Sequence, residues 1–277
     1  MKIAIAADHG GVELKEALKK KFSALNLTDL GTHGNESVDY PDFGAALARA
    51  LHARGARVAV SARSRDKLRS LALTHPGMVA IAVDVLDPAS LQQARRELLA
   101  QFGSLDFVLF CAGRYTPMRA DEGFDLAACT AEWQTNYQGA LHLLDAVLPQ
   151  LLAQGSGHLS LVSSVAGYRG LPRAIGYGPP KAALIHLAET LYLDLQERGI
   201  GVSVVNPGFV ETPMTAVNEF RMPALMKPEQ AALAMIEGYA SGDFEIHFPK
   251  RFTRVVKLLR QLPARAYFAL VKRGTGV

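Results

Sequence analysis

Short β-rich runs alternate with longer helical patterns along the chain, and this alternation restricts the fold more than any other feature. The runs expected to form strands are 2–7, 27–30, 57–61, 78–84, 107–111, 157–163 and 201–206. The segments with the apolar spacing of amphipathic helices are 12–25, 43–54, 65–74, 88–101, 130–153, 179–198 and 227–238. Strands that alternate with helices in this way favour a parallel sheet with crossover connections.

Several of these strands are apolar on both faces, as in the runs 58–60 and 107–110. Strands of this kind are expected where helices cover both sides of a sheet. The sequence therefore predicts an α/β fold with a doubly wound, mostly parallel sheet, arranged as a Rossmann-like three-layer αβα sandwich. No Pro/Gly/Ser-rich linker and no internal repeat divides the 277 residues, so we expect a single domain over 1–277.

Composition and cysteine content indicate a soluble, reduced protein. Hydrophobic residues make up 49% of the chain and charged residues 20%, which is ordinary for a globular core and excludes disorder. Cys111 and Cys129 give neither a disulfide framework nor the spacing of metal ligands, so no metal is expected. The first residues are too quickly polar for a signal peptide, and no apolar run reaches the length of a membrane span. We expect a cytoplasmic protein.

The C-terminal stretch carries only positive charge. Residues 246–277 contain no Asp or Glu and eight basic residues: Lys250, Arg251, Arg254, Lys257, Arg260, Arg265, Lys272 and Arg273. One interpretation is a solvated, basic C-terminal extension over 245–277. The other is contact with an anionic membrane surface or an acyl carrier, because basic and apolar residues mix here with helical spacing. Pro263 divides the stretch into two expected helices, and no motif supports nucleic-acid binding.

A tyrosine, a lysine and a serine form the strongest chemical signal. Tyr177 and Lys181 are four residues apart and so share one face of a helix. A free tyrosine titrates near pH ~10, and an adjacent ammonium favours the phenolate, which brings the phenol closer to use as an acid or base. Ser164 ends an apolar strand thirteen residues before Tyr177. Its hydroxyl can bind a substrate oxygen on which negative charge develops.

This combination resembles the active-site pattern of the short-chain dehydrogenase/reductase family, and the resemblance covers about residues 44–277. It implies hydride transfer between a nicotinamide cofactor and a small-molecule carbonyl or alcohol. Tyr177 would be the acid/base, Lys181 its electrostatic partner and ribose anchor, and Ser164 the donor to the substrate oxygen. Asn136 matches the helix asparagine that completes a proton relay through water to Lys181. A homo-oligomer is also implied, because dimers and tetramers are common in the family.

The resemblance extends to a cofactor site at the ends of successive strands. It implies Asp84 and Val85 at the adenine, Ala112 and Gly113 along the cofactor, a Pro207-Gly208 turn, and Val210 and Thr212 at the nicotinamide amide. Arg63 follows the strand 57–61, where no Asp or Glu is available to bind the ribose diol of NAD. A guanidinium there suits the 2′-phosphate of NADP, so we expect NADP(H).

Two departures from the family pattern and one apolar segment bear on activity. Phe110-Cys111 stands where the family usually has Asn-Asn, and Pro180 stands where serine is common. Residues 214–226 are apolar and rich in methionine, which indicates either a lid over a hydrophobic substrate or ordinary packing.

The front of the chain departs from the reductase pattern. The family's Thr-Gly-x-x-x-Gly-x-Gly loop, whose glycines let the backbone approach a pyrophosphate, is absent. Residues 1–43 instead resemble the start of the type B ribose-5-phosphate isomerase/galactose-6-phosphate isomerase family, through MKIAIAADHGG and DLGTHGNESVDYPDF. That family's Cys-Gly-Thr-Gly segment is missing, so isomerase activity is not expected. The two resemblances meet around 43–51, which favours a recombined or engineered chimera over the alternative of a natural gene fusion.

Two questions follow from this switch. Either 2–7 or 27–30 fills the central strand position of the reductase sheet. Residues 8–11 offer a strand–glycine–helix turn that could accept a phosphate, although Asp8 would repel it. The alternative to an active oxidoreductase is a catalytically silent scaffold with an incomplete dinucleotide site.

Overall fold

A seven-stranded sheet forms the centre of the molecule. The structure is a computed structural model that describes residues 2–6, 42–218, 220 and 222–275. The strand order is β3-β2-β1-β4-β5-β6-β7, and every neighbouring pair is parallel. The strands are β1 Lys2–Ala6, β2 Arg57–Ala62, β3 Val79–Ala82, β4 Phe107–Phe110, β5 Gly157–Val162, β6 Ile200–Pro207 and β7 Glu245–Phe248. The predicted α/β class with a parallel sheet is confirmed.

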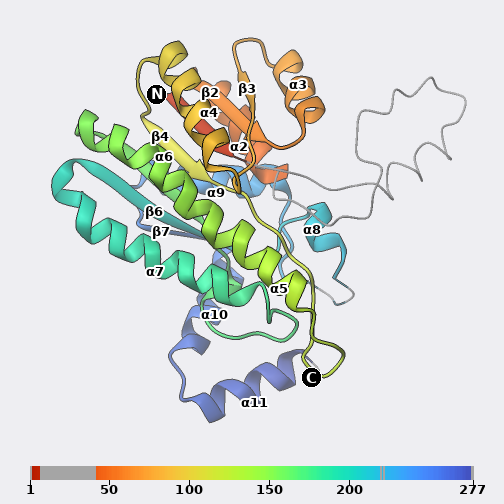
Figure 1. Ribbon diagram of the computed structural model, residues 1–277. Coiled ribbons are helices and arrows are strands. Elements are labelled where there is room, and N and C mark those ends of the chain that lie inside the picture. Colours follow the sequence, from red (N-terminus) through yellow and green to blue (C-terminus); the bar gives the residue numbers. More distant parts are fainter. Residues whose placement is uncertain (1, 7–41, 219, 221, 276–277) are drawn as a thin grey trace, which may run out of the picture.

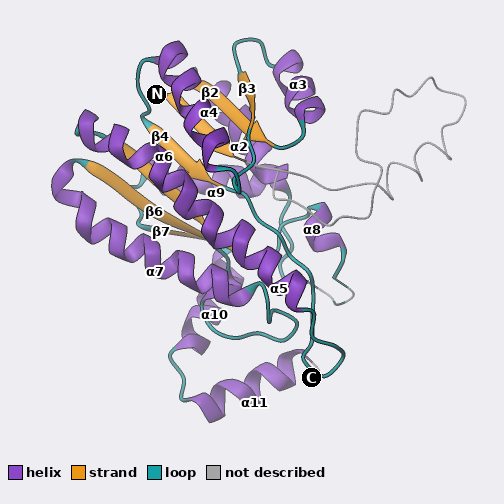
Figure 2. Ribbon diagram, viewed as in Figure 1, coloured by secondary structure: helices purple, strands orange, loops and turns teal. Residues whose placement is uncertain are grey.

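Helices cover both faces of this sheet, which gives the three layers visible in Figures 1 and 2. Side chains of β4 alternate between the two cores: Val108 and Phe110 face one, Phe107 and Leu109 the other. The first core packs against α4 Pro88–Phe102, α6 Gly139–Gln154 and α7 Gly178–Leu195. The second packs against α2 Asp42–His52, α3 Arg65–Thr74 and α9 Pro228–Ala240.

The first strand occupies the centre of the sheet. β1 pairs with β2 on one side and β4 on the other, with Ala6 in register with Ser61 and Phe110. Of the two alternatives for the central position, residues 2–7 are therefore correct, and 27–30 lie outside the described residues. The following helix α2 buries Phe43 and Leu47 in the core beneath α9. The isomerase-like start thus supplies the strand that the reductase pattern lacks.

The stretch expected to be a C-terminal extension begins inside the sheet. Its first four residues are β7, which pairs with β6 and was not predicted. Glu245 accepts hydrogen bonds from Lys257 Nζ at 2.5 Å and Asn206 Nδ2 at 2.9 Å. Burial alone would raise the pKa of Glu245, but hydrogen bonds from Lys257, Tyr168 and Asn206 lower it. The two predicted helices are confirmed as α10 Lys250–Arg260 and α11 Ala264–Thr275, with Pro263 between them.

The helix predicted over 130–153 consists of three elements. It begins earlier, as α5 Leu126–Trp133, because the Asp125 side chain caps it by accepting the Ala128 N–H at 3.0 Å. A π-helical turn follows, Gln134–Gln138, and then α6. Such turns occur often at functional sites, and this one carries Asn136.

Candidate active site

The first turn of α7 holds a completely buried lysine beside a tyrosine. Lys181 is 0% exposed, and its Nζ donates to the carbonyl of Val162, the last residue of β5, at 3.0 Å. The same Nζ lies 5.5 Å from the centroid of the Tyr177 ring. Pro179 and Pro180 are tolerated because the first helical turn has no partners for its N–H groups. The predicted Tyr177–Lys181 pair therefore lies together at the end of β5.

The two serines after β5 tie this strand end to α7. Ser163 Oγ donates to the Lys181 carbonyl at 2.6 Å. Ser164 begins the next turn, and its Oγ accepts the Ala166 N–H at 3.1 Å. Gly167 packs so closely on α7 that a Cβ there would lie 2.7 Å from the Lys181 carbonyl oxygen. The structure thus brings the Ser164 segment and Lys181 against each other.

Asn136 is completely buried but fixes a different segment. Its Oδ1 accepts the Arg114 N–H at 2.7 Å, and its Nδ2 donates to the Arg114 carbonyl at 2.9 Å. Asn136 thereby clamps the chain just after β4. The following residue, Tyr115, places its ring edge-on to Tyr177, with centroids 5.0 Å apart. The relay from Asn136 to Lys181 stays a prediction.

A buried glutamate adds an acidic group that the sequence analysis missed. Glu132 is 0% exposed, and its Oε1 accepts the N–H of Thr116. Burial raises its pKa to about 7, against the opposing effects of the Thr116 hydrogen bonds and the charges of Arg114 and Lys181. Glu132 lies four residues before Asn136, so the two residues share one helix face. This spacing was the sequence feature that could have indicated a glutamate near the site.

Burial also controls the charge of the lysine. It lowers the pKa of Lys181 to about 7, an effect that Cys111 and Glu132 partly oppose. Burial raises the pKa of the Cys111 thiol to about 12, so that group is neutral at neutral pH. Glu132 is therefore the acidic group able to balance the Lys181 ammonium in this range.

The residues expected at the cofactor follow the carboxyl ends of strands: Arg63 after β2, Asp84 and Val85 after β3, Ala112 and Gly113 after β4, and Pro207 and Gly208 at the end of β6. In a parallel sheet these ends share one edge, and ligands bind where the strand order reverses, here between β1 and β4. The predicted cofactor residues therefore follow strand ends at the edge where such ligands bind. The proposed phosphate turn 8–11 lies outside the described residues.

Packing contacts and hydrogen bonds show where Val85, Val210 and Thr212 lie. Val85 is buried against α6, where a Cβ on Gly139 would lie 2.8 Å from it. Val210 is buried and bridges to Met226, while Thr212 hydrogen-bonds Thr215 at the start of α8 Pro213–Ala216. Met226 therefore lies beside the residues that directly follow β6.

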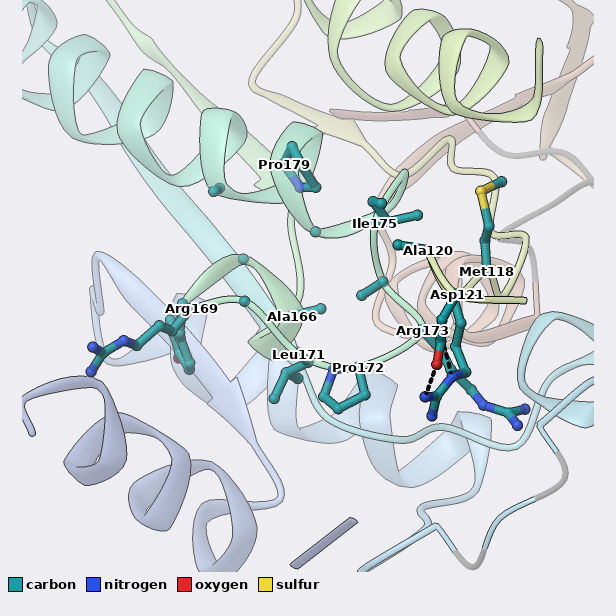
Figure 3. Close-up of a pocket in the computed structure, with 17 residues that line it drawn as sticks. Met118, Ala120, Asp121, Ala166, Arg169, Leu171, Pro172, Arg173, Ile175 and Pro179 are labelled. Atoms are coloured by element: carbon teal, nitrogen blue, oxygen red, sulfur yellow. Dashed lines mark hydrogen bonds and ion pairs between the residues drawn. The ribbon is translucent and has the colours of Figure 1, made fainter. Parts of the chain in front are cut away.

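A cavity of about 600 Å³ lies on the outer side of the loop between Ser164 and Tyr177. It is lined by 118–121, 166–175, 178–179 and 182, so neither Ser164 nor Tyr177 reaches it. Figure 3 shows Leu171, Ile175 and Pro179 around it, with Asp121 on one side and Arg169 on the other. Asp121 accepts two hydrogen bonds from the Arg119 guanidinium. Its wall and the Tyr177 segment are thus continuous.

Comparisons with known sequences divide the chain into the same isomerase-like start and reductase-like remainder that its motifs indicate. The short chain dehydrogenase family profile matches residues 42–221, and the Ribose/Galactose Isomerase profile matches 3–64. The matches overlap within 42–64, which includes the predicted switch. An uncharacterized oxidoreductase of Myxococcus xanthus is 33% identical over 245 residues, covering 83% of this chain and 92% of its own.

Solved structures from both families are similar in fold to this chain. A short chain dehydrogenase from Burkholderia cenocepacia, in complex with NADP, is 21% identical with a TM-score of 0.73, covering 97% of this chain and 96% of its own. A ribose-5-phosphate isomerase from Brucella melitensis is 23% identical with a TM-score of 0.67, covering 88% of this chain and 90% of its own. At these identities the structural likeness concerns the fold.

Proposed function

Because the chain belongs to the short chain dehydrogenase family, we propose that it is an NADP(H)-dependent oxidoreductase acting on a hydrophobic carbonyl or alcohol. The observation that carries this proposal is the buried Lys181, held by the end of β5 beside the Tyr177 ring. A completely buried ammonium is costly to maintain, and such a group beside a phenol is suited to acid–base catalysis.

Each residue has a distinct task in this proposal. Tyr177 donates its phenolic proton to the substrate oxygen in reduction and accepts it in oxidation. The Lys181 ammonium favours the phenolate and anchors the cofactor ribose, and Ser164 donates a hydrogen bond to the oxygen that becomes negative. Asn136 fixes the chain after β4 and completes the proton relay. When bound, NADP(H) supplies or accepts the hydride.

Arg63 is proposed to select the phosphorylated cofactor. It lies exposed directly after β2, beside the central β1, where the adenine ribose of a dinucleotide reaches. Arg63→Ala is expected to weaken NADPH binding by about 10–100-fold, because it removes charge-assisted hydrogen bonds to the 2′-phosphate. NADH binding should change by less than about threefold. Fluorescence titration with both cofactors measures this, and an equal loss for NADPH and NADH would contradict the role.

The substrate class follows from the apolar surfaces near the site. Met226, at the end of the methionine-rich segment, bridges to Val210 just after β6, and the cavity beside the loop before Tyr177 is lined mainly by apolar surface, including Leu171, Ile175 and Pro179. We expect NADPH oxidation with hydrophobic ketones or aldehydes, and little with short polar ones. A panel of matched long-chain and short-chain ketones, followed at the NADPH absorbance, tests this. Equal rates across the panel would contradict the hydrophobic preference.

The silent scaffold remains the second candidate. It is favoured by the missing glycine-rich motif, which leaves the pyrophosphate without its usual backbone donors. An active enzyme requires the segment after β1 to provide substitutes. Cofactor binding separates the two candidates, since a scaffold with an incomplete site would not bind NADPH.

The C-terminal helices are proposed to contact an anionic membrane surface. Arg251, Arg254, Val255 and Leu258 are exposed on one face of α10, where Leu258 is 69% exposed, and α11 exposes Phe268. Among the described residues, no helix is long and apolar enough to cross a membrane. A basic and apolar face of this kind favours binding at the bilayer surface by a protein that works in the cytoplasm.

Vesicle sedimentation tests this contact. The protein should sediment with vesicles of phosphatidylglycerol and phosphatidylcholine at low salt, and not with phosphatidylcholine alone. A double change, Arg251→Glu with Arg254→Glu, should abolish binding, whereas Arg96→Glu with Arg198→Glu, on exposed positions elsewhere, should not. Capture by an acidic acyl carrier without vesicle binding would overturn the membrane assignment.

Sedimentation velocity of the free protein tests the proposed homo-oligomer.

A further inference from the structure

Glu132 is the one completely buried carboxylate among the described residues, and the proposed mechanism gives it no task. It lies on α5, four residues before Asn136. Its Oε1 accepts the Thr116 N–H, but its Oε2 is buried without a hydrogen-bond partner. An unsatisfied buried carboxylate oxygen is costly and requires a compensating charge or a functional reason.

The contacts of Glu132 join the two segments that meet at Tyr177. On one side it binds Thr116, while Asn136 binds Arg114, so α5 and the π-helical turn that follows it hold both ends of the Arg114–Thr116 stretch. Tyr115 lies between them, with its ring against Tyr177. On the other side Gly176 approaches so closely that a Cβ there would collide with Glu132 Oε2. The carboxylate is thus wedged between Thr116 and the residue that precedes Tyr177.

The charged and titratable groups around Glu132 come from three elements. The segment after β4 contributes Arg114, with Cys111 at its start, and α7 contributes Lys181. Its own helix contributes Cys129, and the phenol of Tyr115 also senses its charge. Arg114 lies in the loop, and Cys111 is a neutral thiol. Lys181 is the cation of the proposed mechanism, and Glu132 is close enough to interact with it.

We propose that Glu132 is a positioning residue of this site, which fixes Tyr115 and Tyr177 through Thr116 and Gly176 and whose buried negative charge interacts electrostatically with the Lys181 ammonium. The kinetic part of this inference rests on the proposed function. The electrostatic part concerns the protein alone, because Lys181 titrates with or without turnover. Glu132→Gln separates charge from shape, since the amide oxygen can still accept the Thr116 N–H.

The test is the titration of Lys181, followed by NMR on protein labelled with ¹³C-lysine and without cofactor, the signal being assigned by its loss in Lys181→Met. Removing the buried negative charge of Glu132 destabilises the ammonium, so the midpoint in Glu132→Gln should fall by on the order of one pH unit. The matched control is Glu189→Gln, an exposed glutamate on α7 itself. Its midpoint should equal that of the wild type.

The pH profile of NADPH-dependent reduction supplies the second readout. With a midpoint near 7 in the wild type, a fall of one unit reduces the protonated fraction about tenfold at pH 8 and about twofold at pH 6, and kcat/KM should follow. An unchanged Lys181 titration, with kcat/KM lowered equally at both pH values, would overturn the proposal and leave a structural role. A shifted titration without turnover in any variant would support it and contradict the oxidoreductase assignment.

Discussion

Replacing Tyr177 by phenylalanine is expected to lower kcat for NADPH-dependent reduction by about 10²–10⁴-fold, because it removes the positioned proton donor. The ring is 7% exposed and packs edge-on against Tyr115, so the variant keeps the packing and loses only the hydroxyl. Folding and NADPH affinity should therefore be unchanged. Steady-state kinetics with the best ketone of the panel, together with a thermal melt, measure the effect.

Tyr239→Phe is the matched control for this variant. The control variant also removes one tyrosine hydroxyl, which in the wild type hydrogen-bonds Ser160 at 2.8 Å. Tyr239 lies on α9, on the opposite side of the sheet from α7. Its kcat should remain within about twofold of the wild type, since no proton moves there. A Tyr177→Phe enzyme that kept more than a tenth of wild-type kcat would show that another group donates the proton.

Replacing Lys181 by methionine should have the second largest effect, and in opposite directions on activity and stability. Without the ammonium the phenol loses its electrostatic support and the cofactor ribose its anchor, so kcat/KM should fall by at least about 10²-fold. The fold should become more stable by about 1–4 kcal/mol below pH 7, because a well-packed apolar side chain replaces a buried charge while Glu132 is itself protonated and leaves no unpaired carboxylate. Kinetics and urea unfolding measure the two effects.

The pH dependence of this stability gain has a definite sign. The unfolded chain holds lysine protonated up to about pH 10.4, whereas burial lowers the pKa of Lys181 to about 7 in the folded protein. Below pH 7 both states carry the proton, and the folded state bears the full cost of burial. Above it the unfolded state binds more protons, so wild-type stability rises with pH. The gain should be largest below pH 7 and vanish above about pH 10; a constant difference would contradict a buried ammonium.

The spacing of apolar residues predicted the helices that have a regular apolar face. The helix over 65–74 coincides with α3, and the pair of helices around Pro263 matches α10 and α11. The segment 130–153 was predicted as one helix because a π-helical turn leaves no distinct apolar pattern. β7 was missed because four residues are too few for a pattern, and its pairing with β6 is a tertiary effect.

The site was only partly accessible from the sequence. Motif spacing predicted catalytic roles for Ser164, Tyr177 and Lys181, and these roles stay predictions. The structure places Ser164 directly after β5 and Lys181 against the end of β5, beside the Tyr177 ring. Glu132 was missed because a helical glutamate is ordinarily solvated, and only tertiary packing reveals its burial. The relay through Asn136 stays a prediction. The contact of its side chain with Arg114 was not predicted, because it depends on the path of the chain after β4.

The central claim is that a chain with an isomerase-like start still builds a working NADP(H) site at the β1–β4 edge. Isothermal titration calorimetry of the full chain with NADPH tests this without any substrate. We expect saturable binding with a micromolar Kd, which corresponds to a binding free energy of about −8 kcal/mol. Binding should weaken in Arg63→Ala. No heat at millimolar NADPH would contradict it and identify the chain as a silent scaffold.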